Sequence, residues 1–186
     1  MTTPIPLIAC IDADYRDGEA VTACVAIRDF ADELVAVERV VRSTHVPQPY
    51  VPGSFYLREL PGILAVLSAV GAVSTVTTVV IDGYVWLGGE RPGLGARLFA
   101  EVKVPVIGVA KTPFRDNDRA LAITRGGSAR PLYVTSAGID VTVAASHVSR
   151  MHGAHRLPTI LKRAPLLCAV VAGGEPISQI GSAPES

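Results

Sequence analysis

The stretch that decides the fold is T-T-V-V-I-D-G, residues 77–83, in which β-branched residues fill most positions before an aspartate and a glycine. Such a run is typical of a strand that is buried on both faces in a parallel arrangement. Asp82 and Gly83 end this strand. In an open α/β sheet, ligands bind beyond the carboxyl ends of the strands, so the same stretch predicts where a site lies.

The segments on either side of this strand predict helices. Before it, aliphatic residues recur at helical spacing between positions 57 and 70, and Gly71 closes that helix. After it, residues 93–102 predict a second helix and residues 104–110 a further buried strand. This alternation of strands and helices indicates an α/β fold with parallel strands.

The N-terminal part of the chain predicts a three-stranded antiparallel meander. Its strands are expected at Leu7–Tyr15, Ala20–Arg28 and Leu34–Arg42, with a hairpin turn at Asp17-Gly18 between the first two. Together with the parallel strands, the meander implies a mixed sheet that is flanked by helices.

The C-terminal part predicts two strands and two helices. The strands are expected at Leu121–Thr124 and Pro131–Thr135. One helix is expected to begin at a Thr142 cap and run to Met151, and Pro158 is suited to opening the last helix.

The chain of 186 residues has the length of one domain, expected at residues 1–172, before a Gly-, Pro- and Ser-rich stretch at 173–186 that predicts a disordered tail. Hydrophobic residues make up 49% and charged residues 18%, which indicates a globular protein. The 17 basic and 17 acidic residues balance, which excludes a broadly basic nucleic-acid coat but leaves room for a local basic groove.

Cysteine usage and hydropathy bear on the compartment. Three cysteines, without metal-ligand spacing, disfavour a disulfide framework and predict a reduced, cytoplasmic protein. No stretch reaches the roughly 20 apolar residues of a membrane span, and the first residues lack the basic start of a signal peptide.

Three carboxylates stand where a site is expected. Asp12 interrupts an apolar strand, Asp82 ends the most buried one, and Glu59 shares a helical stripe with the aliphatic residues that face the sheet. Singly, each has an ordinary explanation, either a hydrogen bond to a neighbouring backbone or a cap. Two unit charges about 4 Å apart repel by about 4 kcal/mol at an effective dielectric near 20, so convergent carboxylates require a cation. A divalent ion such as Mg²⁺ prefers such oxygens.

Several motifs resemble those of the endonuclease V family, whose members nick nucleic acid beside deaminated bases. Residues 50–61, Y-V-P-G-S-F-Y-L-R-E-L-P, resemble the family signature, and residues 79–83, V-V-I-D-G, resemble its next block. Residues 105–111, P-V-I-G-V-A-K, and residues 156–158, R-L-P, follow in the family's order. The resemblance spans about residues 7 to 165.

The resemblance implies a ribonuclease H-like fold and a metal-dependent reaction. At the motif positions, Asp12, Glu59 and Asp82 correspond to the metal-binding carboxylates, with Mg²⁺ or Mn²⁺ as the cofactor, and Lys111 to a catalytic lysine near the scissile phosphate. The expected reaction is hydrolysis of a phosphodiester bond 3′ to inosine in DNA or RNA, by a monomer.

The resemblance also assigns residues to nucleic-acid binding. Tyr50 corresponds to the tyrosine that wedges into the strand, and Pro52 and Gly53 shape the gap that a rotated base leaves. Gly83 and Arg91 stand in the block that follows the buried strand.

Two departures from the family pattern bear on activity. The H-P-R triplet expected after Gly83 is reduced to Arg91, and Ile139 stands where a second family histidine aligns. Asp140, next door, either supplies a fourth metal-binding carboxylate or belongs to the start of a helix, where acids are common. The departures leave two alternatives to the nuclease: a relative that binds nucleic acid without cutting it, and a divergent phosphoesterase.

Two further features have open interpretations. Trp86 either stacks on a base or packs its loop onto the sheet. The basic residues between positions 150 and 163 either face phosphates or form a solvated helix face.

Overall fold

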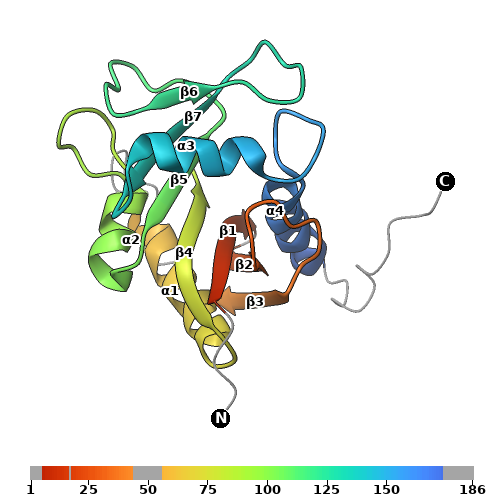
Figure 1. The fold of residues 1–186 in the computed structure, drawn as a ribbon. Helices are drawn as coiled ribbons and strands as arrows, with labels where there is room; N and C mark the ends of the chain where they lie inside the picture. Colours follow the sequence, from red (N-terminus) through yellow and green to blue (C-terminus); the bar gives the residue numbers. More distant parts are fainter. Residues whose placement is uncertain (1–5, 17, 44–55, 174–186) are drawn as a thin grey trace.

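A seven-stranded sheet runs through the protein in the order β3-β2-β1-β4-β5-β7-β6 (Figure 1). The computed structural model describes residues 6–16, 18–43 and 56–173. The strands are β1 (Pro6–Arg16), β2 (Glu19–Ile27), β3 (Val37–Ser43), β4 (Thr75–Asp82), β5 (Val106–Ala110), β6 (Leu121–Ile123) and β7 (Leu132–Ala137). The helices are α1 (Tyr56–Gly71), α2 (Leu94–Val102), α3 (Val141–Arg150) and α4 (Thr159–Ala172).

The strand directions confirm the mixed sheet. Strands β1, β2 and β3 form the antiparallel meander, with Ile11 opposite Cys24 in the first pair. Strand β4 then lies parallel to β1, with Ile81 opposite Ile11, and parallel to β5. Strands β7 and β6 complete the sheet in antiparallel pairing. This is the ribonuclease H-like arrangement that the resemblance implied.

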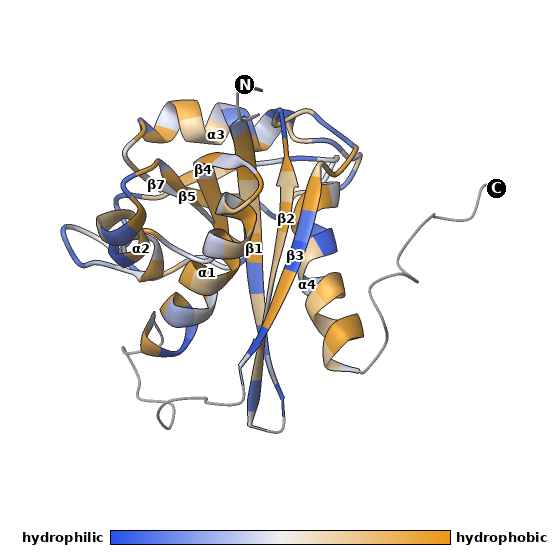
Figure 2. Cartoon of the chain, turned by 90° about the horizontal axis from the view of Figure 1, so that it is seen from below, coloured by the Kyte–Doolittle hydropathy of each residue, from blue (hydrophilic) through white to orange (hydrophobic). Residues whose placement is uncertain are grey.

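Helices cover both faces of the sheet, so two apolar cores form. Strand β1 shows why, because alternate side chains point to opposite faces. Leu7, Ala9 and Ile11 pack with α1 and α2, whereas Ile8 and Cys10 pack with α3 and α4. Figure 2 shows the resulting pattern, with apolar colour concentrated along β1, β4 and β5.

Helix α1 has the boundaries and the buried face that its spacing predicts. Its buried residues are Ile63, Val66 and Val70, and the helix ends at Gly71. It approaches the sheet closely, because a Cβ atom on Gly62 would lie only 2.3 Å from the Thr22 hydroxyl oxygen. This approach brings the first turn of α1 to the end of β1.

Two predicted boundaries were wrong. The N-cap of α3 is Asp140, not Thr142: its carboxylate accepts hydrogen bonds from the backbone N–H groups of Thr142, at 2.8 Å, and Val143, at 3.4 Å. Strand β3 begins at Val37, three residues after the predicted Leu34, whose side chain is 82% exposed. Before Leu34, residues 28–32 form a turn in which the Asp32 carboxylate accepts from the N–H of Asp29.

Some predictions lie outside the described residues. They concern Tyr50, Pro52 and Gly53, the turn residue Asp17, and the stretch at 174–186. Within the described ranges, no helix combines the length and the apolar character that crossing a bilayer requires.

Candidate active site

Three carboxylates line one pocket of about 350 Å³, here called the carboxylate pocket. Asp12 and Asp82 follow the paired residues Ile11 and Ile81 of the parallel strands β1 and β4, so they lie side by side in the sheet, Asp12 within β1 and Asp82 at the end of β4. Glu59 reaches the same pocket from the first turn of α1. The pocket is lined by Ile11, Asp12, Ala13, Glu59, Ile63, Ile81, Asp82, Gly83 and Leu94.

The chain beyond Asp82 is held against the sheet by two glycines. Gly83 has a φ of 113°, a region that residues with a side chain rarely adopt. A Cβ atom on Gly108 of β5 would lie 2.6 Å from the Gly83 carbonyl oxygen, so only glycine lets the loop cross β5 there. The N–H of Val85 then donates to the Thr135 hydroxyl at 2.8 Å.

Burial and mutual repulsion disfavour the ionised carboxylates. Burial raises the pKa of Glu59 to about 8, with further contributions from the charges of Asp12 and Asp82. Burial and the charge of Asp82 raise the pKa of Asp12 to about 6, although Lys111 opposes this shift. The carboxylate pocket thus concentrates negative charge that favours a proton or a cation.

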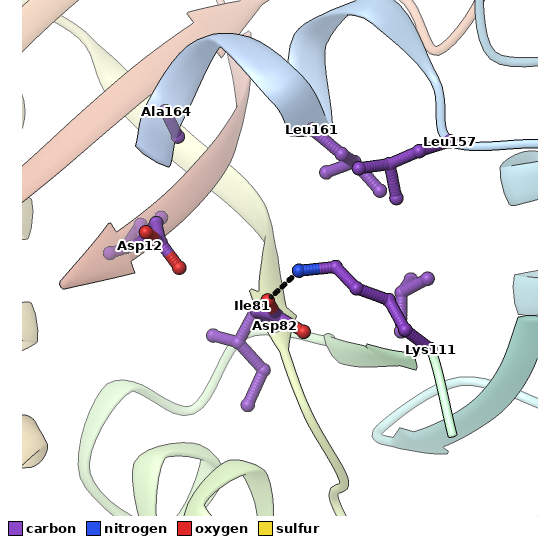
Figure 3. A pocket seen from close by; sticks show the side chains of 9 residues that line it. Asp12, Ile81, Asp82, Lys111, Leu157, Leu161 and Ala164 are labelled. Carbon is purple, nitrogen blue, oxygen red and sulfur yellow. Dashed lines mark hydrogen bonds and ion pairs between the residues drawn. The ribbon is translucent and has the colours of Figure 1, made fainter. Parts of the chain in front are cut away.

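Lys111 supplies a positive charge at the edge of this pocket. It follows β5, and its Nζ lies 2.5 Å from Oδ2 of Asp82. Figure 3 shows this ion pair beneath Leu157 and Leu161, with Asp12 to one side. These residues line a second, narrower crevice on the α4 side of the sheet, and Asp12 and Asp82 border both cavities.

The carboxylates share a pocket without meeting at one point. Among residues 6–16, 18–43 and 56–173, no group of three or more His, Cys, Asp or Glu side chains is gathered closely enough to hold a metal ion. The chemical type of the three side chains fits a hard divalent cation, since carboxylate oxygens are its preferred ligands. A bound cation would also offset the repulsion between the carboxylates. Metal binding would require the three carboxylates to move closer together and Asp82 to loosen its contact with Lys111.

The structure does not bring Asp140 to the carboxylate pocket. Its exposed carboxylate caps α3, and hydrogen bonds from the Thr142 hydroxyl and backbone hold the pKa of Asp140 below its ordinary value. The neighbouring Ile139 packs, partly buried, against the core beneath α3 and α4. Asp140 therefore stabilises the start of α3, and Ile139 contributes to packing of the core.

The loop between β4 and α2 borders a third cavity of about 160 Å³, here called the loop pocket. It is lined by Tyr56, Asp82, Gly83, Tyr84, Leu87, Pro92, Gly93 and Leu94. Arg91 stands outside it, exposed, with its guanidinium donating to the Leu87 carbonyl and lying over the Phe114 ring at 5.1 Å. Trp86 packs the loop onto the sheet, because its indole N–H donates to the Ser136 carbonyl at 2.9 Å.

The sequence did not predict that Arg156 contacts the site. Arg156 donates from Nη2 to the carbonyl oxygens of Lys111 and, at 2.7 Å, of Pro131. The R-L-P motif marks Arg156 in the sequence, but the chain separation of 45 residues hides its contact with Lys111.

Comparison with known proteins agrees with this geometry. The family model for endonuclease V matches residues 1–136. Endonuclease V of Streptomyces coelicolor is 31% identical over 179 residues, which cover 85% of this chain and 76% of the relative. The enzyme of Nostoc punctiforme is 29% identical, over 89% of this chain and 83% of its own.

Solved structures share the fold. The crystal structure of endonuclease V from Streptomyces avermitilis has a TM-score of 0.74 and 25% identity, over 93% of this chain and 84% of that one. Ciona intestinalis endonuclease V, solved with a 23mer DNA that contains an inosine followed by a ribo-adenosine, has a TM-score of 0.77 at 15% identity, over 90% and 86% of the two chains. From the match over most of its length, the chain belongs to the endonuclease V family.

Proposed function

We propose that this protein is a metal-dependent endonuclease that hydrolyses a phosphodiester bond 3′ to a deaminated base such as inosine, in DNA or RNA. The observation that carries the proposal is that Asp12, Glu59 and Asp82 line one pocket at the carboxyl end of β4, beside the middle of β1, with Lys111 at its edge. Membership of the family supports the reaction class, and the inosine-containing DNA bound by the Ciona protein supports the choice of base.

Each site residue has a distinct role in this proposal. Asp12, Glu59 and Asp82 hold Mg²⁺ or Mn²⁺, which when bound supplies an activated water and stabilises the departing 3′ oxygen. If Asp82 held the cation, the Lys111 ammonium would be free to face the scissile phosphate and offset its charge. The ion pair of Lys111 with Asp82 thus represents the resting state of the site.

The loop pocket is the proposed site for the extruded base. It adjoins the carboxylate pocket through Asp82, Gly83 and Leu94, so a base held there leaves its phosphate near the carboxylates. Tyr56 offers an aromatic wall, and Arg97 lies over its ring at 3.6 Å on the far side. Tyr50, Pro52 and Gly53 remain the proposed wedge, on the family motif, and Arg91 a proposed contact of the displaced strand.

Two observations favour a second candidate, a family member that binds nucleic acid without cutting it. Ile139, where a family histidine aligns, packs partly buried against the core, and Lys111 already neutralises Asp82. Both features are compatible with a site that binds a strand but does not activate a water molecule for hydrolysis.

Incubation with end-labelled oligonucleotides tests the proposal. DNA and RNA strands with one inosine, and matched strands with guanosine, are combined with protein and Mg²⁺ or Mn²⁺. We expect one nick, on the 3′ side of inosine, which EDTA abolishes. Asp82→Asn and Glu59→Gln should lose at least about a hundredfold in rate, while the exposed Glu101→Gln on α2 retains it.

The outcomes separate the two candidates. Inosine-dependent binding without a nick, by folded protein in Mn²⁺, would favour the binding protein. Failure to bind or nick any strand at low salt would overturn both.

A further inference from the structure

A fourth cavity, of about 360 Å³, shares Lys111 with the crevice that Asp12 and Asp82 border, and is here called the basic pocket. The antiparallel pairing of β5 with β7 explains its position, because Ala110 at the end of β5 lies opposite Tyr133 at the start of β7. The chain after one strand thereby meets the chain before the other. The lining residues are Lys111, Thr112, Pro113, Arg130, Pro131, Tyr133 and Arg156.

The basic pocket has three cations and no carboxylate in its lining, in a chain whose overall charge is zero. The arginines of the described residues that form ion pairs lie outside this pocket. They are Arg16, Arg42, Arg115, Arg150 and Arg163, and each has an acidic partner. Within the described part of the chain, Arg130 and Arg156 form no salt bridge. Their positive charge is therefore not neutralised by the protein.

Arg156 is held in place without losing its charge. Its Nη2 donates to two backbone carbonyls, which orient the guanidinium but carry no net negative charge. Its Nε is buried, whereas its Nη1 is accessible and makes no hydrogen bond with the described residues. A fixed guanidinium with Nη1 unused is prepared to bind an anion, because little side-chain freedom remains to be lost.

Arg130 and Tyr133 complete an anion site beside Arg156. The Arg130 guanidinium and the Tyr133 hydroxyl make no hydrogen bond with other described residues, so their donors are available to a ligand. Planar guanidinium groups match the oxygens of a phosphate, and a phenol adds one further donor.

We propose that the basic pocket binds a backbone phosphate of the nucleic-acid strand, adjacent to the phosphate that is cut. This subsite rests on the proposed function, because Lys111 is shared between the basic pocket and the site that holds the scissile bond. A strand that passes Lys111 and continues along the sheet edge meets Arg130 and Arg156 next.

The salt dependence of binding tests the subsite without relying on cleavage. Affinity for an inosine-containing strand is measured in EDTA across a range of salt concentrations, for the wild-type protein, Arg130→Gln and Tyr133→Phe. Each phosphate contact contributes about 0.7–0.9 to the slope of log K against log salt. We expect Arg130→Gln to lower that slope by about 1 and to weaken low-salt binding roughly threefold to tenfold.

Arg115→Gln is the matched control, because Arg115 is an exposed arginine that lines none of the cavities and pairs with Asp116. It should bind as the wild type does apart from a small general loss of charge. In cleavage measured over a range of strand concentrations, Arg130→Gln should raise KM and leave kcat within about twofold, since it acts on binding.

Shortening the strand locates the contact. Removing nucleotides step by step from one end should abolish the difference between wild type and Arg130→Gln, whereas trimming the other end should leave it. Equal slopes for Arg130→Gln and Arg115→Gln, or a difference that survives trimming from both ends, would overturn the subsite. If the wild type nicks inosine strands in that case, the proposed function stands.

Inorganic phosphate provides the second arm, because a free anion has the same chemistry as the strand's phosphate. Phosphate should compete with the strand for wild-type protein, and less for Arg130→Gln. Should Arg130→Gln alter phosphate competition while strand affinity and slope stay unchanged, the pocket would be one for small anions and the strand assignment would fail.

Discussion

At Glu59, burial and charge repulsion act in the same direction. The carboxyl is withdrawn from water in the first turn of α1 and faces Asp12 and Asp82, so its pKa in the folded protein is raised from 4.5 to about 8. The native state therefore holds a proton that the unfolded chain has released between these two pH values. Its contribution to stability is complete below about pH 4.5 and is lost as the pH rises through 8.

Glu59→Gln should consequently stabilise the metal-free protein at alkaline pH. In urea unfolding with EDTA, we expect a gain of about 1–3 kcal/mol in the free energy of unfolding at pH 8.5, below what the full pKa shift implies because the side chain keeps some exposure. At pH 4.5 the gain should nearly vanish. Glu101→Gln serves as the control, and an equal gain at both pH values would show that charge is not the cause.

Among the elements, the segment between α3 and α4 depends on one buried guanidinium. Arg125 is 8% exposed and donates to the backbone carbonyls of residues 149, 151, 153, 155 and 156. The first of these carbonyls lies in the last turn of α3, and the other four belong to the segment between the helices. Arg125 takes the place of secondary structure in satisfying those four. The segment it orders carries Arg156, which contacts the Lys111 carbonyl.

Arg125→Lys should therefore not behave as a conservative change. One ammonium cannot reach five separated carbonyls, and leaving several unsatisfied should cost on the order of 3 kcal/mol in the free energy of unfolding. Chemical denaturation measures this loss. Arg119→Lys, at an exposed position, should cost much less; similar losses in the two variants would remove the proposed role of Arg125.

The start of α3 separates a capping role of Asp140 from a metal-binding one. Asp140→Ala should lower the melting temperature, because two backbone N–H groups lose their acceptor. Asp140→Ser, which retains a capping oxygen, should restore most of it. The stabilisation by added Mn²⁺ should be the same in all three proteins, and its loss in both variants would instead make Asp140 a ligand.

At the scale of the whole molecule, the two cores enclose all three thiols. Cys10, Cys24 and Cys168 are free and buried, and burial raises the pKa of each thiol, to about 12 for Cys24 and Cys168. Cys10 and Cys24 lie on the neighbouring strands β1 and β2 and point to opposite cores. A reagent can reach both only when the sheet itself opens.

Thiol modification should thus report global unfolding. We expect the folded protein to react with a disulfide reagent far more slowly than in urea, where all three thiols should react, since thiolate formation and access are both suppressed. The rates for the three cysteines should be alike and should fall when Mn²⁺ is added. One cysteine that reacts early would reveal local opening of its strand or helix instead.

Much of the fold follows from patterns that are local in the chain. The run at residues 77–83, the alternation along β1 and the stripe of α1 each reflect the period of one element, and such periods are visible in the sequence. The same patterns place Asp12 inside an apolar strand, Glu59 in the first turn of α1 and Asp82 at the end of β4. The family motifs select these three from the other acids. Their meeting at one pocket was predictable for that reason.

Boundaries were less predictable, because neighbouring residues compete for one role. Both Asp140 and Thr142 can cap a helix, and the backbone at Asp140 is extended, so the helix begins two residues earlier than the threonine suggests. Before β3, the Asp32 carboxylate stabilises a turn at residues 28–32, and Leu34, which favoured a strand, lies exposed between that turn and the strand. These outcomes depend on backbone hydrogen bonds that residue type alone does not specify.

From the residues alone one could predict the order of the elements, the mixed sheet and the three carboxylates that line one pocket, since each rests on short-range periodicity or on a motif. Only the tertiary structure decided which charges neutralise one another. Lys111 pairs with Asp82 across 29 residues of sequence, and Arg156 donates to the Lys111 carbonyl. The antiparallel pairing of β5 with β7 brings together the basic residues of a pocket whose lining has no acidic residue. Coulomb forces depend on distance in space, and distance in space is set by the packing of the whole sheet.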